Sequence, residues 1–172
     1  MRARLLLALL VCGPSAGYAQ NLLQNPDFGS VITPWLPTAG TISVTRVASP
    51  PDYVGGTGEA QVTHSGAAFD TQGMSQCVPV TGSTLYEVSG YLRIPSGQSV
   101  NNHSARLGGE WFQNANCTTS LMQNFSDVFI FPSDGENTWI FRNGTGSSPT
   151  MAQSFLFKAR INKLDATAYT AL

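Results

Sequence analysis

Short runs of alternating apolar and polar residues, separated by clusters of glycine, proline, asparagine and serine, dominate this sequence. The side chains of a β-strand point alternately to its two faces, so this period-two pattern predicts strands and the clusters predict turns. We identify no amphipathic helix and no internal repeat, and the chain is therefore predicted to be all-β. The expected strands are residues 41–47, 59–63, 74–80, 85–94, 105–112, 127–132, 138–141 and 153–161.

Three of these segments have one apolar and one polar face. Residues 85–94 carry mainly apolar side chains at even positions and Glu87, Tyr91 and Arg93 at odd positions. Residues 105–112 and 153–161 show the same contrast, with the apolar side chains at odd positions. A strand of this kind covers a core on one side only, so the pattern predicts two antiparallel sheets packed as a β-sandwich.

The first 19 residues have the pattern of a secretory signal peptide. Arg2 and Arg4 precede an apolar run at residues 5–12, and small residues lead to Ala19. The apolar run is too short to span a bilayer, and no later segment is long and apolar enough to do so. We expect cleavage after Ala19 and secretion, either extracellular or periplasmic. The remaining residues, 20–172, are enough for a single domain with a sizeable core.

Cysteine usage predicts one disulfide. Cys12 would be removed with the signal peptide, which leaves Cys77 and Cys117. In an oxidising compartment such a pair forms a bridge, here closing a loop of about 40 residues and worth roughly 4 kcal/mol in the chain-entropy model. A zinc site is the weaker interpretation, because it needs two further ligands and His64 and His103 show no ligand spacing.

The charge balance argues against a nucleic-acid partner. Residues 20–172 contain seven basic and ten acidic residues. Binding to nucleic acid depends on dense lysine and arginine contacts with phosphate. Charged residues make up only 11% of the chain, a composition more typical of an extracellular sheet protein than of a helical cytosolic enzyme.

Several short motifs resemble a family of secreted proteins. The stretch NLLQNPDF at residues 21–28 resembles the start of carbohydrate-binding modules found beside cellulases and xylanases. Trp35, SQCVPVTGSTLYEVSGYLR at 75–93 and EWFQNANC at 110–117 agree with the family in order. The resemblance implies a galactose-binding-domain-like jelly-roll sandwich. It also implies that Asn25-Pro26-Asp27-Phe28 forms a turn that seats Phe28 in the core, after a first strand.

Two departures from the family bear on metal binding and on the C-terminus. Gly29 and Ser30 stand where the family often has a glutamate that helps to hold a structural calcium. The chain also lacks the family's usual last strand, whose aspartate can share that calcium. We therefore expect no cofactor and no metal, although Asp27 and Asp165 are candidate oxygen donors for calcium. The missing strand predicts an uncovered sheet edge, where a protein partner could bind.

The candidate ligand-binding residues lie on the polar faces and near loops. Glycan-binding sites combine aromatic rings, which stack on sugar rings, with planar polar side chains that bind hydroxyl groups. If the long strands are neighbours, their polar faces form a groove floor. The alternative is an ordinary solvated sheet face with weak cross-strand pairs. The candidates are Tyr91, Arg93, Arg106, Glu110 and Phe112, with Trp139 and Tyr53 near loops and Lys158 and Arg160 as further neighbours.

The other tryptophans and the histidines have simpler interpretations. Trp35 and Trp111 are expected in the core, Trp35 beside Phe28. His103 lies in a polar stretch, Asn-His-Ser, where an exposed side chain is expected. No pair of carboxylates has a spacing that singles it out for glycoside hydrolysis, and there is no G-x-S-x-G motif for a serine hydrolase.

These observations favour a secreted, non-catalytic glycan-binding protein whose partner is a polysaccharide or other glycan. Two alternatives stay open. One is an exported structural or protein-interaction β-sandwich that uses its C-terminal sheet edge, and the other is a small secreted hydrolase.

Overall fold

The computed structural model of the chain describes residues 9–11, 20–48, 58–98 and 103–172. Most of the expected signal peptide, and Tyr53, lie outside this part of the chain. The described residues form strands and one short 3₁₀ helix, η1. The elements are β1 (Leu9–Val11), β2 (Leu36–Pro37), β3 (Ile42–Ala48), β4 (Gly58–His64), β5 (Thr71–Pro79), β6 (Leu85–Leu92), β7 (Ser104–Phe112), β8 (Leu121–Ile130), η1 (Pro132–Asp134), β9 (Ile140–Ser147), β10 (Ser154–Asn162) and β11 (Tyr169–Ala171).

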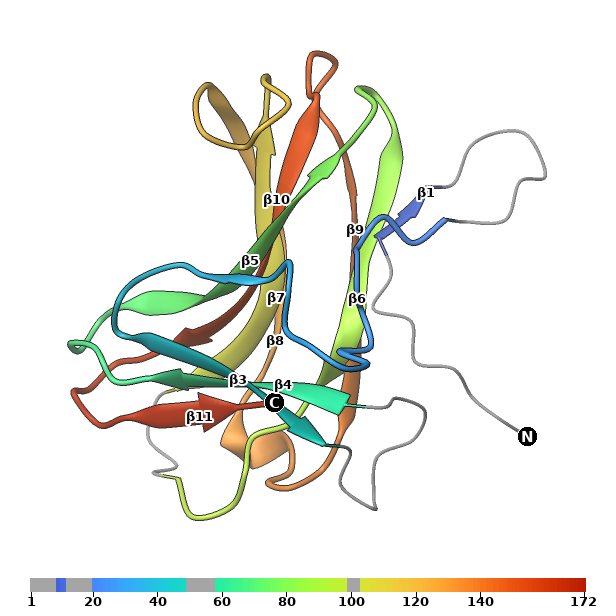
Figure 1. Cartoon of the computed structure of the whole chain (residues 1–172). Helices are drawn as coiled ribbons and strands as arrows, with labels where there is room; N and C mark the ends of the chain where they lie inside the picture. Colours follow the sequence, from blue (N-terminus) through green and yellow to red (C-terminus); the bar gives the residue numbers. More distant parts are fainter. Residues whose placement is uncertain (1–8, 12–19, 49–57, 99–102) are drawn as a thin grey trace, which may run out of the picture.

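One layer is a five-stranded antiparallel sheet in the order β2-β5-β10-β7-β8. Strand β10 lies at its centre and pairs along its full length with both β5 and β7. These strands sweep together from the top of the molecule to its lower left (Figure 1). The register places Arg160 of β10 directly opposite Arg106 of β7 and Leu156 opposite Glu110.

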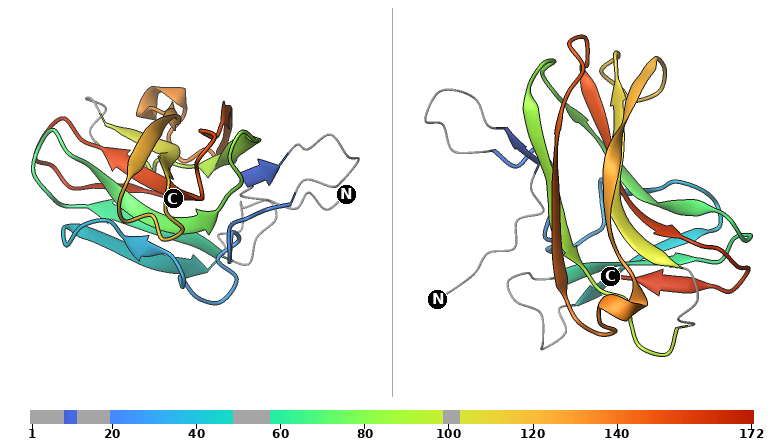
Figure 2. Two further views of the ribbon diagram at one scale, coloured as in Figure 1. Left: turned by 90° about the horizontal axis from the view of Figure 1, so that it is seen from above. Right: turned by 180° about the vertical axis from the view of Figure 1, so that it is seen from behind.

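The second layer consists of two smaller antiparallel sheets, β1-β6-β9 and β11-β4-β3. They are joined where Arg93, just after β6, exchanges two backbone hydrogen bonds with Leu172, of 2.8 and 2.9 Å. Figure 2 shows β6 and β9 beside the five-stranded sheet, with β3, β4 and β11 crossing at the base. The predicted all-β, two-sheet antiparallel sandwich is confirmed.

The C-terminus differs from the prediction. Residues 169–171 form β11, which pairs with β4, and Leu172 continues to the backbone of Arg93 beside β6. The segment expected to leave an edge uncovered therefore fills the junction between the two smaller sheets. A protein partner at this edge stays a prediction, because nothing in the fold tests it.

The core lies between the layers and is rich in aromatic rings. Trp111 is 1% exposed and contacts Phe155, with ring centroids 4.3 Å apart. Trp35 is also buried and packs beside Phe28, with ring centroids 5.5 Å apart. Both tryptophans are therefore core residues, as predicted.

The N-terminal segment is held without forming a strand. The backbone N–H of Phe28 donates to the carbonyl of Asn25, so the predicted turn is present and Phe28 is buried. Residues 20–28 contain no strand, however, so the predicted first strand is wrong. Instead, the buried side chain of Gln76 accepts from the Gln24 N–H at 2.7 Å and donates to the Gln24 carbonyl at 3.0 Å.

Two strands run well beyond their predicted bounds. Residues 121–130 form one strand where only 127–132 was expected, and residues 140–147 form another where 138–141 was expected. Among the described residues, no helix is long and apolar enough to cross a membrane.

Candidate functional site

The outward face of the five-stranded sheet carries a strip of charged side chains, which we call the polar face. Because paired residues in antiparallel strands share a face, the register of β7, β8 and β10 brings these side chains together. Their exposures lie between 15% and 27%, so they are partly buried and still reach solvent. The polar face consists of Arg106, Glu110, Asp127, Lys158 and Arg160, with Phe129 at its border.

Each charge on the polar face has an opposite partner. The Lys158 ammonium donates to the Glu110 carboxylate. The Asp127 carboxylate accepts from Arg160 and lies 3.7 Å from Nη1 of Arg106. Partly exposed pairs of this kind contribute little to stability, but they hold donors and acceptors in defined positions.

Asp127 reaches across the sheet because of a local irregularity. The pairing of β7 with β8 shifts register between Leu107 and Gly109, so that Ser126 and Asp127 lie opposite Gly108. This is a β-bulge, which redirects a side chain. A Cβ atom at Gly108 would lie 2.0 Å from Oδ1 of Asp127, so only glycine allows the carboxylate to lie over the strand.

An aromatic ring borders the charged strip. The guanidinium carbon of Arg106 lies 5.4 Å from the centroid of the Phe129 ring, and its Nε donates to the Ser104 hydroxyl at 2.8 Å. Phe129 is itself exposed. The polar face thus combines a solvent-facing ring with fixed planar donors and acceptors, which suits a ligand rich in hydroxyl groups.

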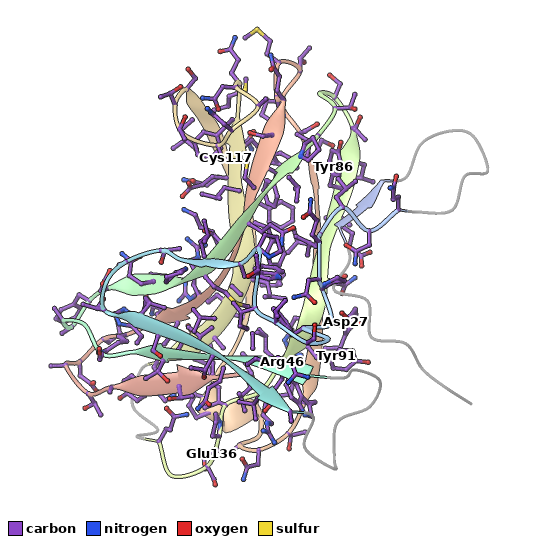
Figure 3. All side chains as sticks on the ribbon, viewed as in Figure 1. Asp27, Arg46, Tyr86, Tyr91, Cys117 and Glu136 are labelled. Atoms are coloured by element: carbon purple, nitrogen blue, oxygen red, sulfur yellow. A yellow bond between two sulfur atoms is a disulfide. The ribbon has the colours of Figure 1, made fainter. Side chains whose placement is uncertain are left out.

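The disulfide closes one end of the polar face. Cys77 of β5 is bonded to Cys117, with Cα atoms 6.0 Å apart, as predicted. The loop of residues 113–120 turns back over the sheet, where the Ser154 hydroxyl donates to the Asn114 carbonyl at 2.5 Å. Figure 3 shows Cys117 at the upper end of the molecule. Phe112 lies beneath this end and is buried, so its predicted role in ligand stacking is wrong.

The other predicted site residues lie on the second layer. Tyr91 of β6 pairs with Phe141 of β9, on a different sheet from Arg106 and Glu110. Figure 3 shows Tyr91 near the lower end of β6, far from Cys117. Arg93 and Trp139 lie beside Tyr91, with the Arg93 guanidinium 5.1 Å from the centroid of the Trp139 ring. The condition that the long strands are neighbours in one sheet is therefore not met for β6, and Tyr91 and Arg93 do not share a groove floor with Arg106 and Glu110.

Both histidines are buried, so the expectation of an exposed His103 is wrong. The His103 ring stacks on Tyr169 of β11 with centroids 3.8 Å apart. His64 is fully buried, with Nδ1 accepting from the Gly66 N–H at 3.1 Å and Nε2 lying 3.4 Å from the Asp70 carboxylate. The Lys163 ammonium, also fully buried, donates to the Gly66 carbonyl at 2.6 Å. No motif in the sequence marks this cluster.

The stability of the fold should fall as the solution is acidified. Burial, and then the nearby Lys163 charge, lower the pKa of His64 below 6.5, although Asp70 acts in the opposite direction. The unfolded chain then binds more protons than the folded chain, so the His64 contribution is complete above pH 6.5 and is lost as the pH falls below it. Urea unfolding midpoints at pH 8, 7, 6 and 5 should therefore decrease below pH 7. His64→Gln should flatten this dependence, and an unchanged slope in that variant would contradict the assignment.

The described residues contain no group of three or more histidine, cysteine, aspartate or glutamate side chains placed to hold a metal ion. The Asp165 carboxylate accepts from the Tyr169 hydroxyl and the Thr167 N–H, both at 2.8 Å. These hydrogen bonds, the one from Tyr169 first, lower the pKa of Asp165. That the protein has no resident cofactor stays a prediction.

Comparison with known proteins identifies relatives in structure only. No family model matches the sequence, and no curated protein sequence matches it. Among solved structures, a family 22 carbohydrate-binding module from the Clostridium thermocellum xylanase Xyn10B matches with a TM-score of 0.56 and 14% identity, covering 84% of this chain and 85% of that one.

Two glycoside hydrolase structures match over part of their length. An arabinose-bound α-L-arabinofuranosidase has a TM-score of 0.65 and 18% identity over 87% of this chain. A C. thermocellum structure with xylanase and carbohydrate-binding modules, complexed with xylohexaose, has a TM-score of 0.53 and 11% identity over 80% of this chain. This chain spans about a quarter of the length of each, 25% and 24%. The protein therefore has the fold of the β-sandwich carbohydrate-binding modules.

Proposed function

We propose that the protein is a non-catalytic glycan-binding module and that the polar face binds the sugar. The observation that carries this proposal is the strip of paired charges that Glu110, Lys158, Asp127, Arg106 and Arg160 form beside the exposed ring of Phe129. Sugar hydroxyls both donate and accept hydrogen bonds, so they suit a surface on which carboxylates and guanidinium groups alternate.

The geometry also limits the ligand class. The strip holds two carboxylates and three cations, so it lacks the strong net charge expected of a site for highly acidic polymers. Because each charge is already paired, a neutral hydroxyl can bind without exposing an isolated charge. The C. thermocellum xylanase structure contains xylohexaose. A neutral xylose polymer is therefore our first candidate ligand.

Secretion and the absence of catalysis belong to the same proposal. The residue pattern of positions 1–19 supports export. The matched structure, of which this chain covers 85%, is a family 22 carbohydrate-binding module. The protein is thus proposed to act by attachment to a polysaccharide.

Calorimetry with xylohexaose, and with cellohexaose as a second probe, tests this function. The intact protein should bind at least one of them. Arg106→Ala should weaken binding by about 10- to 100-fold, because it removes a charged hydrogen-bond donor worth about 1.5–3 kcal/mol. Phe129→Ala should also weaken binding, because it removes the aromatic ring on which the sugar stacks. Phe69→Ala is the matched control, since Phe69 is 82% exposed and lies outside the polar face. Failure to bind either probe, or equal binding by Phe129→Ala and Phe69→Ala, would contradict the proposal.

A further inference from the structure

A second group of aromatic and charged side chains lies on the opposite layer, where the two smaller sheets meet. We call it the aromatic corner, and it consists of Tyr91, Phe141, Arg93, Trp139 and Glu59. The backbone bonds between Arg93 and Leu172 join the sheets at this point. Because its residues belong to β4, β6, β9 and the segments next to them, the aromatic corner shares no side chain with the polar face.

The side chains of the aromatic corner form two sets of contacts. The rings of Tyr91 and Phe141 have centroids 5.1 Å apart and planes tilted by 55°. Arg93 lies over the Trp139 ring and forms an ion pair with Glu59 at 3.5 Å, in which the two side chains are only 13% and 3% exposed. Tyr91 and Phe141, in contrast, are 38% and 45% exposed. A largely buried ion pair and two rings that face solvent thus lie at the same junction of the sheets.

A cavity of about 50 Å³ lies directly beneath this surface. Its lining reaches the surface at Tyr91, Trp139, Pro26 and Leu172, while its inner part is formed by buried apolar residues from both layers. The space exists because four positions on its wall carry alanine where larger side chains would fill it. These are Ala60, Ala105, Ala159 and Ala171.

The size and chemistry of the cavity define its occupant. A single water needs about 10–15 Å³ of such space and two to four polar partners, so 50 Å³ accommodates a group of only a few heavy atoms. The inner wall is apolar, which favours a methyl group over water. The mouth is aromatic and charged, which favours a ring with hydroxyl groups outside the cavity. An acetyl group on a sugar has this combination.

We propose that the aromatic corner is a second binding site, which recognises an acetyl substituent on a glycan. The acetyl methyl enters the cavity, the carbonyl stays at the mouth near Trp139, and the sugar ring lies against Tyr91 and Phe141. This site rests on the proposed glycan-binding function only for its ligand class. Of the polar-face residues, Arg160 alone also lines the cavity, and the contacts proposed for the acetyl group and the sugar ring use none of them. The acetyl group has two sources, an O-acetylated sugar or an N-acetylhexosamine.

Two matched pairs of probes test the site with the full chain. One pair is O-acetylated and unmodified xylo-oligosaccharide, and the other is a hexamer of N-acetylglucosamine and cellohexaose. For at least one pair, calorimetry should show that the acetylated member binds more tightly by a factor of about ten or more. This is the discrimination that a small apolar pocket typically gives for a group the size of a methyl. The pair that shows the preference identifies the source of the acetyl group.

Three variants separate this site from the polar face. Ala171→Val narrows the cavity with a residue type that is common in strands. Tyr91→Ala removes a side chain from the mouth of the cavity, and the fold should tolerate this change because Tyr91 is exposed. Both should abolish the preference for the acetylated probe. Phe129→Ala, in contrast, should retain a preference of about tenfold or more while it weakens binding of the unmodified probe at the polar face. Equal affinity for both members of each pair, or a preference that survives Tyr91→Ala, would overturn the site alone. Absence of binding to all four probes would overturn the proposed function as well.

Discussion

Trp111→Ala is expected to lower the free energy of unfolding by about 3–5 kcal/mol, the usual cost of removing a buried tryptophan from a core. The Trp111 ring is 1% exposed and contacts the rings of Tyr86, Phe125 and Phe155. Its loss leaves a cavity at the point where both layers meet, which the surrounding strands cannot close without breaking their pairing. Small domains have about 5–15 kcal/mol of stability in total, so much of the population should unfold under mild denaturant.

Guanidinium unfolding followed by circular dichroism measures this effect. Phe69→Ala is the matched control, because it removes an aromatic ring that is 82% exposed. Trp111→Phe should retain most of the stability, since the smaller ring still fills part of the space. The assignment of Trp111 to the core would be wrong if Trp111→Ala shifted the unfolding midpoint no more than Phe69→Ala does.

Removing the disulfide should have a comparable effect. The double variant Cys77→Ser/Cys117→Ser opens a loop with a sequence separation of 40 residues. In the chain-entropy model this bond contributes about 4 kcal/mol, because it restricts the unfolded chain. The variant also releases the loop of residues 113–120 from Cys77 of β5, so the upper end of the polar face should lose its order.

The reductant dithiothreitol provides the internal control for this experiment. It should lower the unfolding midpoint of the intact protein to that of the double variant, and it should leave the double variant unchanged. Mass spectrometry after alkylation gives an independent readout. If Cys77 and Cys117 were both alkylated without reductant, the pairing itself would be refuted.

Several features of the fold followed directly from residue order. In β6, β7 and β10 the alternation identified the inward faces correctly, because neighbouring side chains of a strand must point to opposite sides. The two cysteines of residues 20–172 form the predicted pair. Trp35 and Trp111 are buried as expected, since large rings stabilise the fold most when they are removed from water.

Other elements could not be predicted because their stability comes from tertiary contacts. β9 contains Asn143, Gly144 and Gly146, which disfavour a strand locally. Yet Gly144 and Gly146 are needed, because a Cβ atom at either position would lie within 2.8 Å of Val128 or Phe125 of β8. The strand forms because it pairs with β6 and packs closely against β8, and neither contact is visible in the local sequence.

The residues of the candidate site were also predicted only in part from the local sequence. Alternation correctly placed Arg106, Glu110 and Tyr91 on the polar sides of their strands, but it does not reveal which strands are neighbours. The pairing of β7 with β10 assembled the polar face, while the pairing of β6 with β9 placed Tyr91 on the other layer. Asp127 was missed because its position depends on a β-bulge, and His103 because β11 returns to cover it.

Residue order by itself determined the strands with clear alternation, the face that each presents to the core, and the cysteine pair. The strands and their inward faces depend on neighbouring residues only. The cysteine pairing could be predicted because Cys77 and Cys117 are the two cysteines that follow the expected signal peptide. Only the tertiary structure decided that the polar side chains form two separate groups and that a cavity lies beneath one of them. That outcome depends on hydrogen bonds between strands far apart in the chain, and on how completely the side chains of two layers fill the space between them.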